Sequence, residues 1–213
     1  MNNRSLSHRY VLLASILGVG LLSCSPAPAA RQHHPNQTLR NLQTAYRGER
    51  NAHNRYLAFA QKADEEGYRE VAALFRAVAR AEEVHELNHS AAIHGMGGTA
   101  ASVIEFPVVK STRENLLTAS KGEDYEQETM YPAFIQQAEA EHNLNAAYTF
   151  DLARKAERQH SNLFANALTS LENGWEISRT YYVCTVCGYT VEEPVTGQCI
   201  SCASPREKYE AMS

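Results

Sequence analysis

Four consecutive segments between residues 38 and 173 repeat their apolar positions with the spacing of an amphipathic α-helix. Each segment is rich in Ala, Glu, Leu, Gln and Arg, which favour helices, and has few glycines inside its periodic stretch. A capping-box spacing opens the third segment, and glycines follow the others. The predicted helix boundaries are Gly67, Gly95, Ser111, about His142 and Gly174.

The stretch MGGTAASVIEFPVVK separates the second predicted helix from the third. It is too long for a tight antiparallel turn, so the pattern predicts two helical hairpins joined by one crossover. This is the ferritin-like form of the four-helix bundle. We therefore expect a mainly α protein with its main domain at residues 38–173.

Residues 1–24 differ from the rest of the chain. A short positive region precedes YVLLASILGVGLL, an apolar run that is shorter than the roughly 20 residues of a membrane span and indicates a signal peptide. The run ends in Leu21-Leu22-Ser23-Cys24, which resembles the lipobox of bacterial lipoproteins and predicts lipidation of Cys24. An uncleaved anchor, or an ordinary signal peptide with a chance cysteine, is the alternative. Residues 25–37 would then form a flexible tether.

The composition narrows the class of partners. The chain has 213 residues, 44% of them hydrophobic and 21% charged, and its formal net charge is -4. This length accommodates one full domain and a small module. No long basic run appears, so nucleic acid is not an expected partner.

Glutamate and histidine recur at matching positions in the two halves of the predicted bundle. Glu82-Glu83-Val84-His85 and Glu157-Arg158-Gln159-His160 each place a carboxylate and an imidazole on one helix face. With upstream Glu49 and Glu123, the two motifs reproduce the ligand set of di-iron carboxylate bundles. Either motif alone is common on a solvated helix, and His89, one turn after His85, could equally form a surface pair.

Four of the five cysteines lie near the C-terminus in two C-x-x-C pairs. They are Cys184, Cys187, Cys199 and Cys202. Two such knuckles fit one tetrahedral metal bound by four thiolates, and the residue types alone do not separate iron from zinc. Two disulfides are the alternative in an exported protein.

Glu126, three residues after Glu123, adds a fifth carboxylate that ordinary ferritin-type sites do not need. With the stretch ENLLTASKGEDYEQETMYPAFIQQAEAE and the four-cysteine module, it makes residues 38–210 resemble rubrerythrin, a family that fuses a di-iron four-helix domain to a rubredoxin-like domain. The resemblance implies a linker at 174–180 and a small rubredoxin-like β/knuckle domain at 181–213. The di-iron ligands that it implies are Glu49, Glu82, His85, Glu123, Glu126, Glu157 and His160.

The resemblance also implies the cofactors and several supporting roles. Two non-haem irons, oxo-bridged when oxidised, and one iron bound by four cysteines are expected, with zinc as a possible substitute. Tyr56 and Tyr131 match tyrosines that donate hydrogen bonds to ligand carboxylates, the alternative being two core tyrosines. Pro132 must interrupt the third helix near the site. One iron is expected to exchange between His85 and Glu126 as the redox state changes.

The second knuckle departs from the family pattern. Ile200 and Ala203 stand where proline and glycine are usual, and alanine resists the backbone conformation that glycine permits. The sequence therefore predicts mild strain at Ala203. In the first knuckle, Gly188 is expected to adopt the turn conformation without strain. Tyr182 and Tyr189 are expected to be core aromatic residues.

We expect a peroxidase that reduces hydrogen peroxide to water, protects against oxidative stress and receives electrons through the four-cysteine iron. A ferroxidase or iron-handling protein would use the same seven ligands without needing the module, and a non-catalytic, metal-bound tethered module is a third possibility. The expected partners are hydrogen peroxide, an unidentified electron-donor protein and a second copy of the chain. Export predicts a location on the periplasmic side, with membrane contact only through the lipid.

Overall fold

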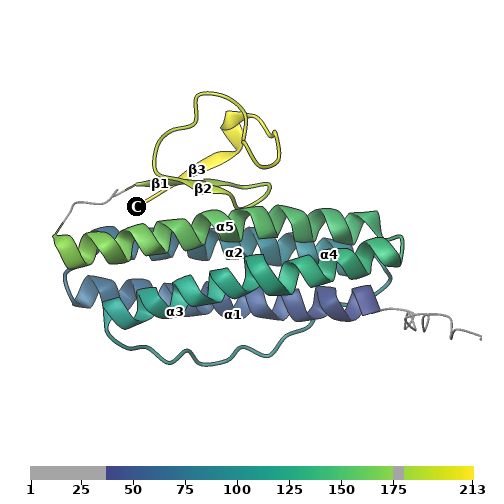
Figure 1. The fold of residues 1–213 in the computed structure, drawn as a ribbon, viewed down its shortest axis with the longest axis horizontal. Coiled ribbons are helices and arrows are strands. Elements are labelled where there is room, and N and C mark those ends of the chain that lie inside the picture. Colours follow the sequence, from purple (N-terminus) through teal and green to yellow (C-terminus); the bar gives the residue numbers. More distant parts are fainter. Residues whose placement is uncertain (1–36, 175–179) are drawn as a thin grey trace, which may run out of the picture. The chain divides into compact units, whose positions relative to one another are not determined.

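The computed structural model describes residues 37–174 and 180–213 (Figure 1). The predicted signal peptide, Cys24 and nearly all of the predicted tether lie outside the described residues, as does most of the predicted linker. None of the described helices combines the length and the apolarity that a membrane span needs.

The described residues form a bundle of long helices and a small C-terminal sheet, as the sequence predicts (Figure 1). The third helix of the bundle consists of α3, a π-helical segment η1 and α4. The helical elements are α1 (Gln37–Glu65), α2 (Arg69–Gly95), α3 (Thr112–Tyr125), η1 (Glu126–Met130), α4 (Tyr131–Ala140) and α5 (Leu144–Asn173).

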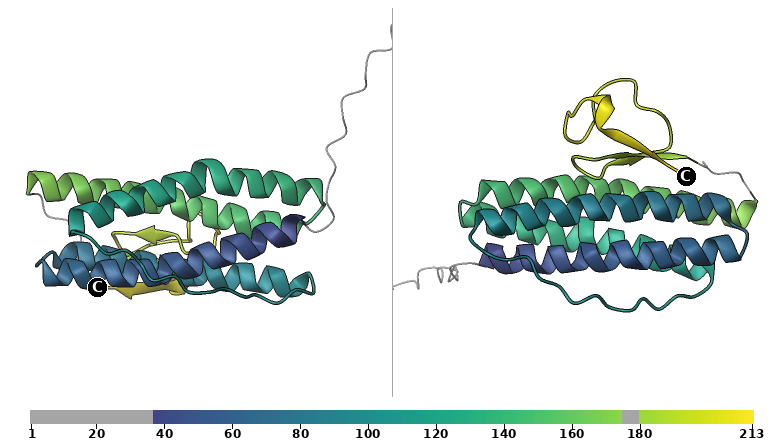
Figure 2. Two further views of the ribbon diagram at one scale, coloured as in Figure 1. Left: turned by 90° about the horizontal axis from the view of Figure 1, so that it is seen from below. Right: turned by 180° about the vertical axis from the view of Figure 1, so that it is seen from behind.

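Local sequence signals set the helix ends. The Ser111 side chain accepts a hydrogen bond from the Glu114 amide, and the Glu114 carboxylate accepts one from the Ser111 amide, which completes the predicted capping box of α3. Gly174 ends α5 in the left-handed conformation, with a φ of 67°. Between α2 and α3, the crossover runs along α1 and α3, on the side of the bundle away from the sheet (Figures 1 and 2).

The break in the third helix lies beside Pro132, as predicted. Pro132 has no amide hydrogen, so the helix cannot keep its regular hydrogen bonds through this point. The Tyr131 amide instead donates to the carbonyl of Glu126, five residues earlier, which is the π-helical pattern. This widened turn carries Glu126 and leads directly into Tyr131.

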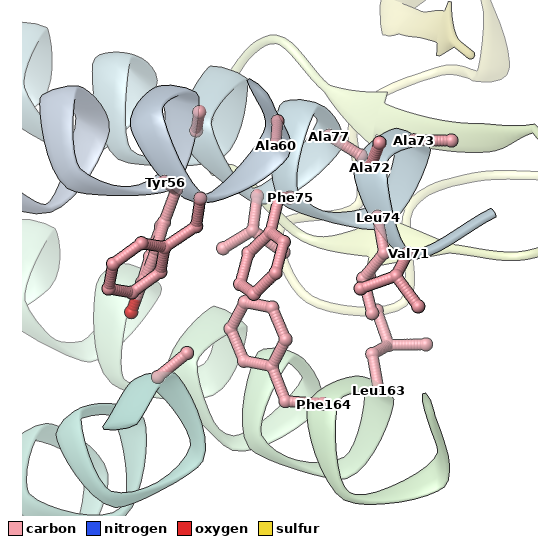
Figure 3. Close-up of a cluster of buried hydrophobic side chains, with 14 of the residues drawn as sticks. Tyr56, Ala60, Val71, Ala72, Ala73, Leu74, Phe75, Ala77, Leu163 and Phe164 are labelled. Atoms are coloured by element: carbon pink, nitrogen blue, oxygen red, sulfur yellow. The ribbon is translucent and has the colours of Figure 1, made fainter. Parts of the chain in front are cut away.

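A cluster of aromatic side chains fills one half of the bundle core. The rings of Tyr56, Phe75 and Phe164 contact one another, with centroid distances of 6.0 Å for Tyr56–Phe75, 5.3 Å for Phe75–Phe164 and 5.4 Å for Tyr56–Phe164 (Figure 3). All three are fully buried, and Leu74 and Val78 complete the apolar surroundings. Burial of side chains of this size stabilises each by roughly 1.5–3 kcal/mol relative to exposure. The cluster also fixes the ring of Tyr56, whose hydroxyl enters the polar centre of the bundle.

The C-terminal sheet has the strand order β2-β1-β3 and is antiparallel throughout. Tyr182 of the central strand pairs with Val191 on one side and with Ala211 on the other. A short 3-10 segment precedes the last strand. The elements are β1 (Tyr181–Cys184), β2 (Thr190–Val191), η2 (Arg206–Lys208) and β3 (Tyr209–Met212).

The sheet module packs against α2 and α5 of its own bundle (Figures 1 and 2). Tyr181 and Val183 belong to the same apolar cluster as the bundle core, so the buried tyrosine of β1 is Tyr181, whereas the predicted core aromatic Tyr182 is only half-buried. The Arg80 side chain donates to Glu210 at 3.0 Å, and Asn88 donates to the carbonyl of Val186 at 2.9 Å. These contacts bring the cysteine module onto the helices that carry the two E-x-x-H motifs.

Candidate metal centres

Two groups of buried carboxylates and imidazoles lie at the centre of the bundle. In each group, one potential ligand atom per residue lies within 4.8 Å of all the others. Glu82 and Glu157 belong to both groups, so their carboxylates lie between the two positions. The first group is Glu49, Glu82, His85 and Glu157, and the second is Glu82, Glu123, Glu157 and His160.

Each histidine of the motifs directs one ring nitrogen into the carboxylates and the other toward the sheet module. His85 Nδ1 lies 2.9 Å from both Glu82 and Glu157, and His160 Nδ1 lies 2.8 Å from Glu157. His85 Nε2 lies 3.0 Å from the carbonyl oxygen of Cys187. When Nε2–H donates to that carbonyl, Nδ1 is left unprotonated and suited to bind a metal.

The outward nitrogen of His160 has a similar environment. Its Nε2 atom lies 3.3 Å from the carbonyl oxygen of Gly188 and 3.2 Å from the hydroxyl of Thr190. The two imidazoles are therefore oriented by backbone and hydroxyl oxygens of residues 187–190, a segment far from them in the sequence. Outer contacts of this kind fix the tautomer and the ring orientation of metal-binding histidines.

The two predicted tyrosines donate to carboxylates of the groups. The Tyr56 hydroxyl donates to Glu123 Oε1, and the Tyr131 hydroxyl donates to Glu49 Oε1. Both tyrosines are fully buried. Each leaves the second oxygen of its carboxylate available to a metal.

The unpaired oxygens of these carboxylates match what metal ions would require. Glu49, Glu82 and Glu123 are fully buried, and each has one oxygen without a hydrogen-bond partner. An ionised carboxylate in such a place is strongly destabilising unless it is paired with a cation or bound to a metal. The residues present therefore fit two divalent cations.

Without metal, the cluster retains protons. Burial first, and the charge of Glu157 second, raise the pKa of Glu49 to about 8 and that of Glu82 to about 7. Burial also opposes ionisation of Glu157, but the two imidazoles together lower its pKa. Burial disfavours the charged form of His160, but its carboxylate neighbours raise its pKa to about 10. Metal binding must displace these protons.

Glu126 belongs to neither group, although it interacts with their carboxylates. It is half-buried at the start of the π-helical turn and contributes no atom to either set of converging ligands. Burial, together with the charges of Glu49 and Glu123, raises its pKa. The role of Glu126 as a metal ligand stays a prediction.

The four C-terminal cysteines converge on one point. Their thiols are free, with Sγ–Sγ distances of 3.7 Å for Cys184–Cys202 and 3.6 Å for Cys187–Cys199. Both are far too long for the roughly 2.05 Å of a disulfide bond. They match the edge, about 3.8 Å, of a sulfur tetrahedron with metal–sulfur bonds of about 2.3 Å. The module therefore fits one tetrahedral metal.

Both knuckles have a left-handed residue directly after the second cysteine, and the sequence predicts strain in the knuckle where that residue is alanine. Gly188 has a φ of 77° and Ala203 a φ of 58°, so alanine occupies a left-handed conformation that costs it about 1–2 kcal/mol. Gly188 is constrained further by its surroundings. A Cβ atom there would lie 2.8 Å from His85 Cδ2 and 3.1 Å from the carbonyl oxygen of Ala81. The module can approach His85 this closely only with glycine at position 188.

His89, for which the sequence left a surface pair open, is fully buried, and its Nε2 atom lies 3.0 Å from the Tyr131 hydroxyl oxygen. The spacing of four residues from His85 puts both on one helix face, and this was the available signal. The partner on α5, Thr149, carried no signal of its own.

Comparisons with known proteins agree with this geometry. The rubrerythrin family profile matches residues 40–168. Nigerythrin from Nitratidesulfovibrio vulgaris is 34% identical over 82% of this chain and 86% of its own length, and Rubrerythrin-2 from Clostridium acetobutylicum is 34% identical over 80% and 94%. The structure of fully reduced nigerythrin has a TM-score of 0.75 at 35% identity, covering 82% of this chain and 86% of the other. A bacterioferritin from Desulfovibrio desulfuricans, at 22% identity and a TM-score of 0.60, shares the fold.

The geometry and the comparisons agree on the cofactors. The carboxylate–histidine groups form a di-iron carboxylate site, and the four cysteines form a rubredoxin-like iron site.

Proposed function

The chain belongs to the rubrerythrin family of di-iron oxidative-stress proteins, and from that membership we propose that it is a peroxidase. It would reduce hydrogen peroxide to water, with replacement electrons entering through the four-cysteine site. The balanced reaction consumes one peroxide, two protons and two electrons and releases two waters. Two irons held by the carboxylates and imidazoles of the two groups would supply the electron pair, and an iron held by the four cysteines would replace those electrons one at a time.

The observation that carries this proposal is the contact between His85 and Cys187. His85 Nδ1 lies among the carboxylates of the di-iron site, and its Nε2 atom is 3.0 Å from the carbonyl oxygen of Cys187, whose thiol belongs to the four-cysteine site. The two sites are thus joined by one side chain, one hydrogen bond and a few covalent bonds. We assign the electron route to this connection.

Carboxylates of the site are candidates for relaying the two protons of the reaction. The raised pKa values of Glu49 and Glu82, about 8 and 7, belong to the metal-free protein, and bound metal would displace their protons. The Tyr56 and Tyr131 hydroxyls hold Glu123 and Glu49 in place. The exchange of ligand between His85 and Glu126 remains part of the proposal.

The test is stopped-flow mixing of the reduced, iron-loaded protein with hydrogen peroxide. We expect rapid oxidation of the di-iron site, followed by oxidation of the four-cysteine iron. In the Cys184→Ser/Cys199→Ser variant, one turnover should persist but turnover driven by an external donor should stop. Ser201→Ala, in the same module, is the control. Donor-driven turnover that survives in the double variant would refute the electron route.

Two further measurements distinguish the peroxidase from the alternative functions. A reduced protein that reacts with oxygen and added ferrous iron much faster than with peroxide would support the ferroxidase function instead. Zinc at every site of protein matured in its native compartment would leave only a non-catalytic role. The contact between His85 and Cys187 favours the peroxidase, because iron oxidation alone has no need of the module.

We also propose a homodimer. In the described chain the module packs on its own bundle, so one copy already joins the two sites. The crossover between α2 and α3 nevertheless exposes Val103, Phe106 and Val108, with Phe106 98% exposed. Exposed apolar residues grouped in this way mark interaction surfaces. Light scattering should give the mass of a dimer, and Phe106→Ser should shift it toward the monomer.

Export and lipidation of Cys24 stay proposals that rest on the sequence. Because nicotinamide cofactors belong to the cytosol, an exported protein would take its electrons from a periplasmic cytochrome or a membrane reductase. Cell fractionation should find the wild-type protein in the membrane fraction and Cys24→Ser in the soluble periplasmic fraction. Recovery of both in the cytosol would contradict the proposal.

A further inference from the structure

Three side chains outside the predicted ligand set form a hydrogen-bonded chain that ends on Glu49. Thr149 Oγ1 of α5 lies 3.2 Å from His89 Nδ1 of α2. His89 Nε2 lies 3.0 Å from the hydroxyl oxygen of Tyr131 on α4. The Tyr131 hydroxyl contacts Glu49 Oε1 of α1. All four residues are buried, so water does not compete for these bonds.

The number of protons that these side chains carry fixes which atom donates in each of their hydrogen bonds. When Glu49 is ionised to bind a metal, its carboxylate only accepts, so the single Tyr131 proton is donated to Glu49. The Tyr131 oxygen must then accept from His89 Nε2–H. A neutral imidazole has one N–H, so His89 Nδ1 has a lone pair and accepts from the hydroxyl of Thr149.

The surroundings keep His89 neutral. His89 is fully buried, and both of its hydrogen-bond partners, Tyr131 and Thr149, are uncharged, which favours the neutral imidazole. Its Nε2 atom is 3.7 Å from Glu49 Oε1, which is too long for a direct hydrogen bond. The imidazole therefore acts on Glu49 through Tyr131 and not by pairing with it.

We propose that His89 and Thr149 are positioning residues of the di-iron site, which select one imidazole tautomer and thereby hold the Tyr131 proton on Oε1 of Glu49. This leaves Oε2, the oxygen without a hydrogen-bond partner, for the metal. The proposal rests on the proposed function only in taking Glu49 as a metal ligand. It requires nothing of peroxide chemistry.

The alternative tautomer shows why Thr149 matters. If Nδ1 carried the proton, Nε2 would become an acceptor and would compete with Glu49 for the Tyr131 hydroxyl. The Thr149 hydroxyl opposes this, because if its oxygen accepted from Nδ1–H, its own buried proton would have no acceptor among the described residues. Thr149→Val keeps the shape of the side chain but removes the donor, and Thr149→Ser keeps the donor.

The first measurement is a long-range ¹H–¹⁵N correlation spectrum of the histidines in the full chain loaded with Zn²⁺, with His89→Gln to assign the His89 signals. We expect the Nε2–H tautomer in the wild type and in Thr149→Ser, and a mixture of tautomers in Thr149→Val. An Nδ1–H tautomer or an imidazolium in the wild type would overturn the proposal.

The second measurement is the affinity for Co²⁺, whose thiolate absorption bands distinguish the four-cysteine site from the carboxylate site. Thr149→Val should bind Co²⁺ about tenfold more weakly at the carboxylate site, with unchanged affinity at the cysteines, and Thr149→Ser should match the wild type. Equal affinities for Thr149→Val and Thr149→Ser would overturn the proposal. Because neither measurement involves peroxide, a protein without peroxidase activity would still give a clear result.

Discussion

His85 and Cys187, which belong to different metal sites, share a hydrogen bond of 3.0 Å between an imidazole nitrogen and a backbone carbonyl oxygen. The two residues are 102 positions apart in the sequence. Their contact depends on the packing of β1 and β2 against α2 and α5. Changes that move the sheet module should therefore affect the di-iron site, and the first prediction tests this.

Gly188→Ala should separate the module from the bundle. The added Cβ would collide with the His85 ring, and alanine is strained at a φ of 77°. We expect electron transfer between the two sites to slow by about tenfold or more, because small misplacements of reacting groups have effects of this size. The measurement is the rate at which the four-cysteine iron is oxidised after peroxide is added.

A matched control is available in the same module. A Cβ added at Gly197 meets no atom within 4 Å, so Gly197→Ala should leave the electron-transfer rate unchanged. Equal rates in the Gly188 and Gly197 variants would contradict the predicted role of the His85 contact.

Ala203→Gly should stabilise the cysteine module. The left-handed backbone at a φ of 58° costs alanine about 1–2 kcal/mol, and the extra freedom of glycine in the unfolded chain offsets about 0.5–1 kcal/mol of the gain. The free energy of unfolding should rise by about 1 kcal/mol or less. Denaturant titration followed through the absorption of the four-cysteine iron measures it, and a loss of stability would refute the predicted strain.

Tyr56→Phe should weaken metal binding at the second carboxylate group. The substitution removes the hydroxyl that donates to Glu123 Oε1 but keeps the ring that packs between Phe59 and Phe164. We expect a loss of about tenfold to a hundredfold in Co²⁺ affinity at the carboxylate site. Tyr125→Phe, at an exposed tyrosine, is the control and should bind Co²⁺ normally.

The metal-free protein should become less stable as the pH rises from about 5 to about 8. Glu49 and Glu82 have pKa values raised to about 8 and 7 in the fold, whereas glutamate in the unfolded chain ionises near 4.3. Between these values the folded state holds protons that the unfolded state has released, so the free energy of unfolding falls with rising pH. The raised pKa of His160, about 10, acts in the same direction above pH 6.5.

Loading with Zn²⁺ should reverse this dependence. Bound metal requires ionised carboxylates, so protons compete with it and the stabilisation by metal grows with pH. Denaturant unfolding of the metal-free and zinc-loaded protein across this pH range measures both slopes. Parallel slopes for the two forms would contradict the prediction.

Much of the candidate site follows from spacing in the sequence. Each E-x-x-H motif has to place its two ligands on one helix face, and the structure brings six of the seven predicted di-iron ligands, from four helices, into two overlapping groups. Pro132 predicted a break in the third helix, because a residue without an amide hydrogen cannot continue the regular pattern. The spacing within each motif and the break beside Pro132 depend on contacts within one helix, which a sequence specifies directly.

The features that could not be predicted from the sequence depend on contacts between different helices and strands. Burial of His89 is decided by Thr149 and Tyr131 on other helices. The choice of Tyr181 over Tyr182 as the buried aromatic depends on which face of β1 meets the bundle, and a period of two residues does not specify this. The position of Glu126 depends on the π-helical turn, whose start Pro132 does not determine.

Main-chain atoms carry most of the connection between the module and the two imidazoles. The acceptors for His85 and His160 include the carbonyl oxygens of Cys187 and Gly188, and a carbonyl is present whatever side chain its residue has. Exposed side chains of residues 180–213 that do not contact the bundle can therefore change without loss of the alignment of the rings. A transplanted module with a different surface but the same backbone path would preserve that alignment, whereas one larger residue at position 188 would destroy it.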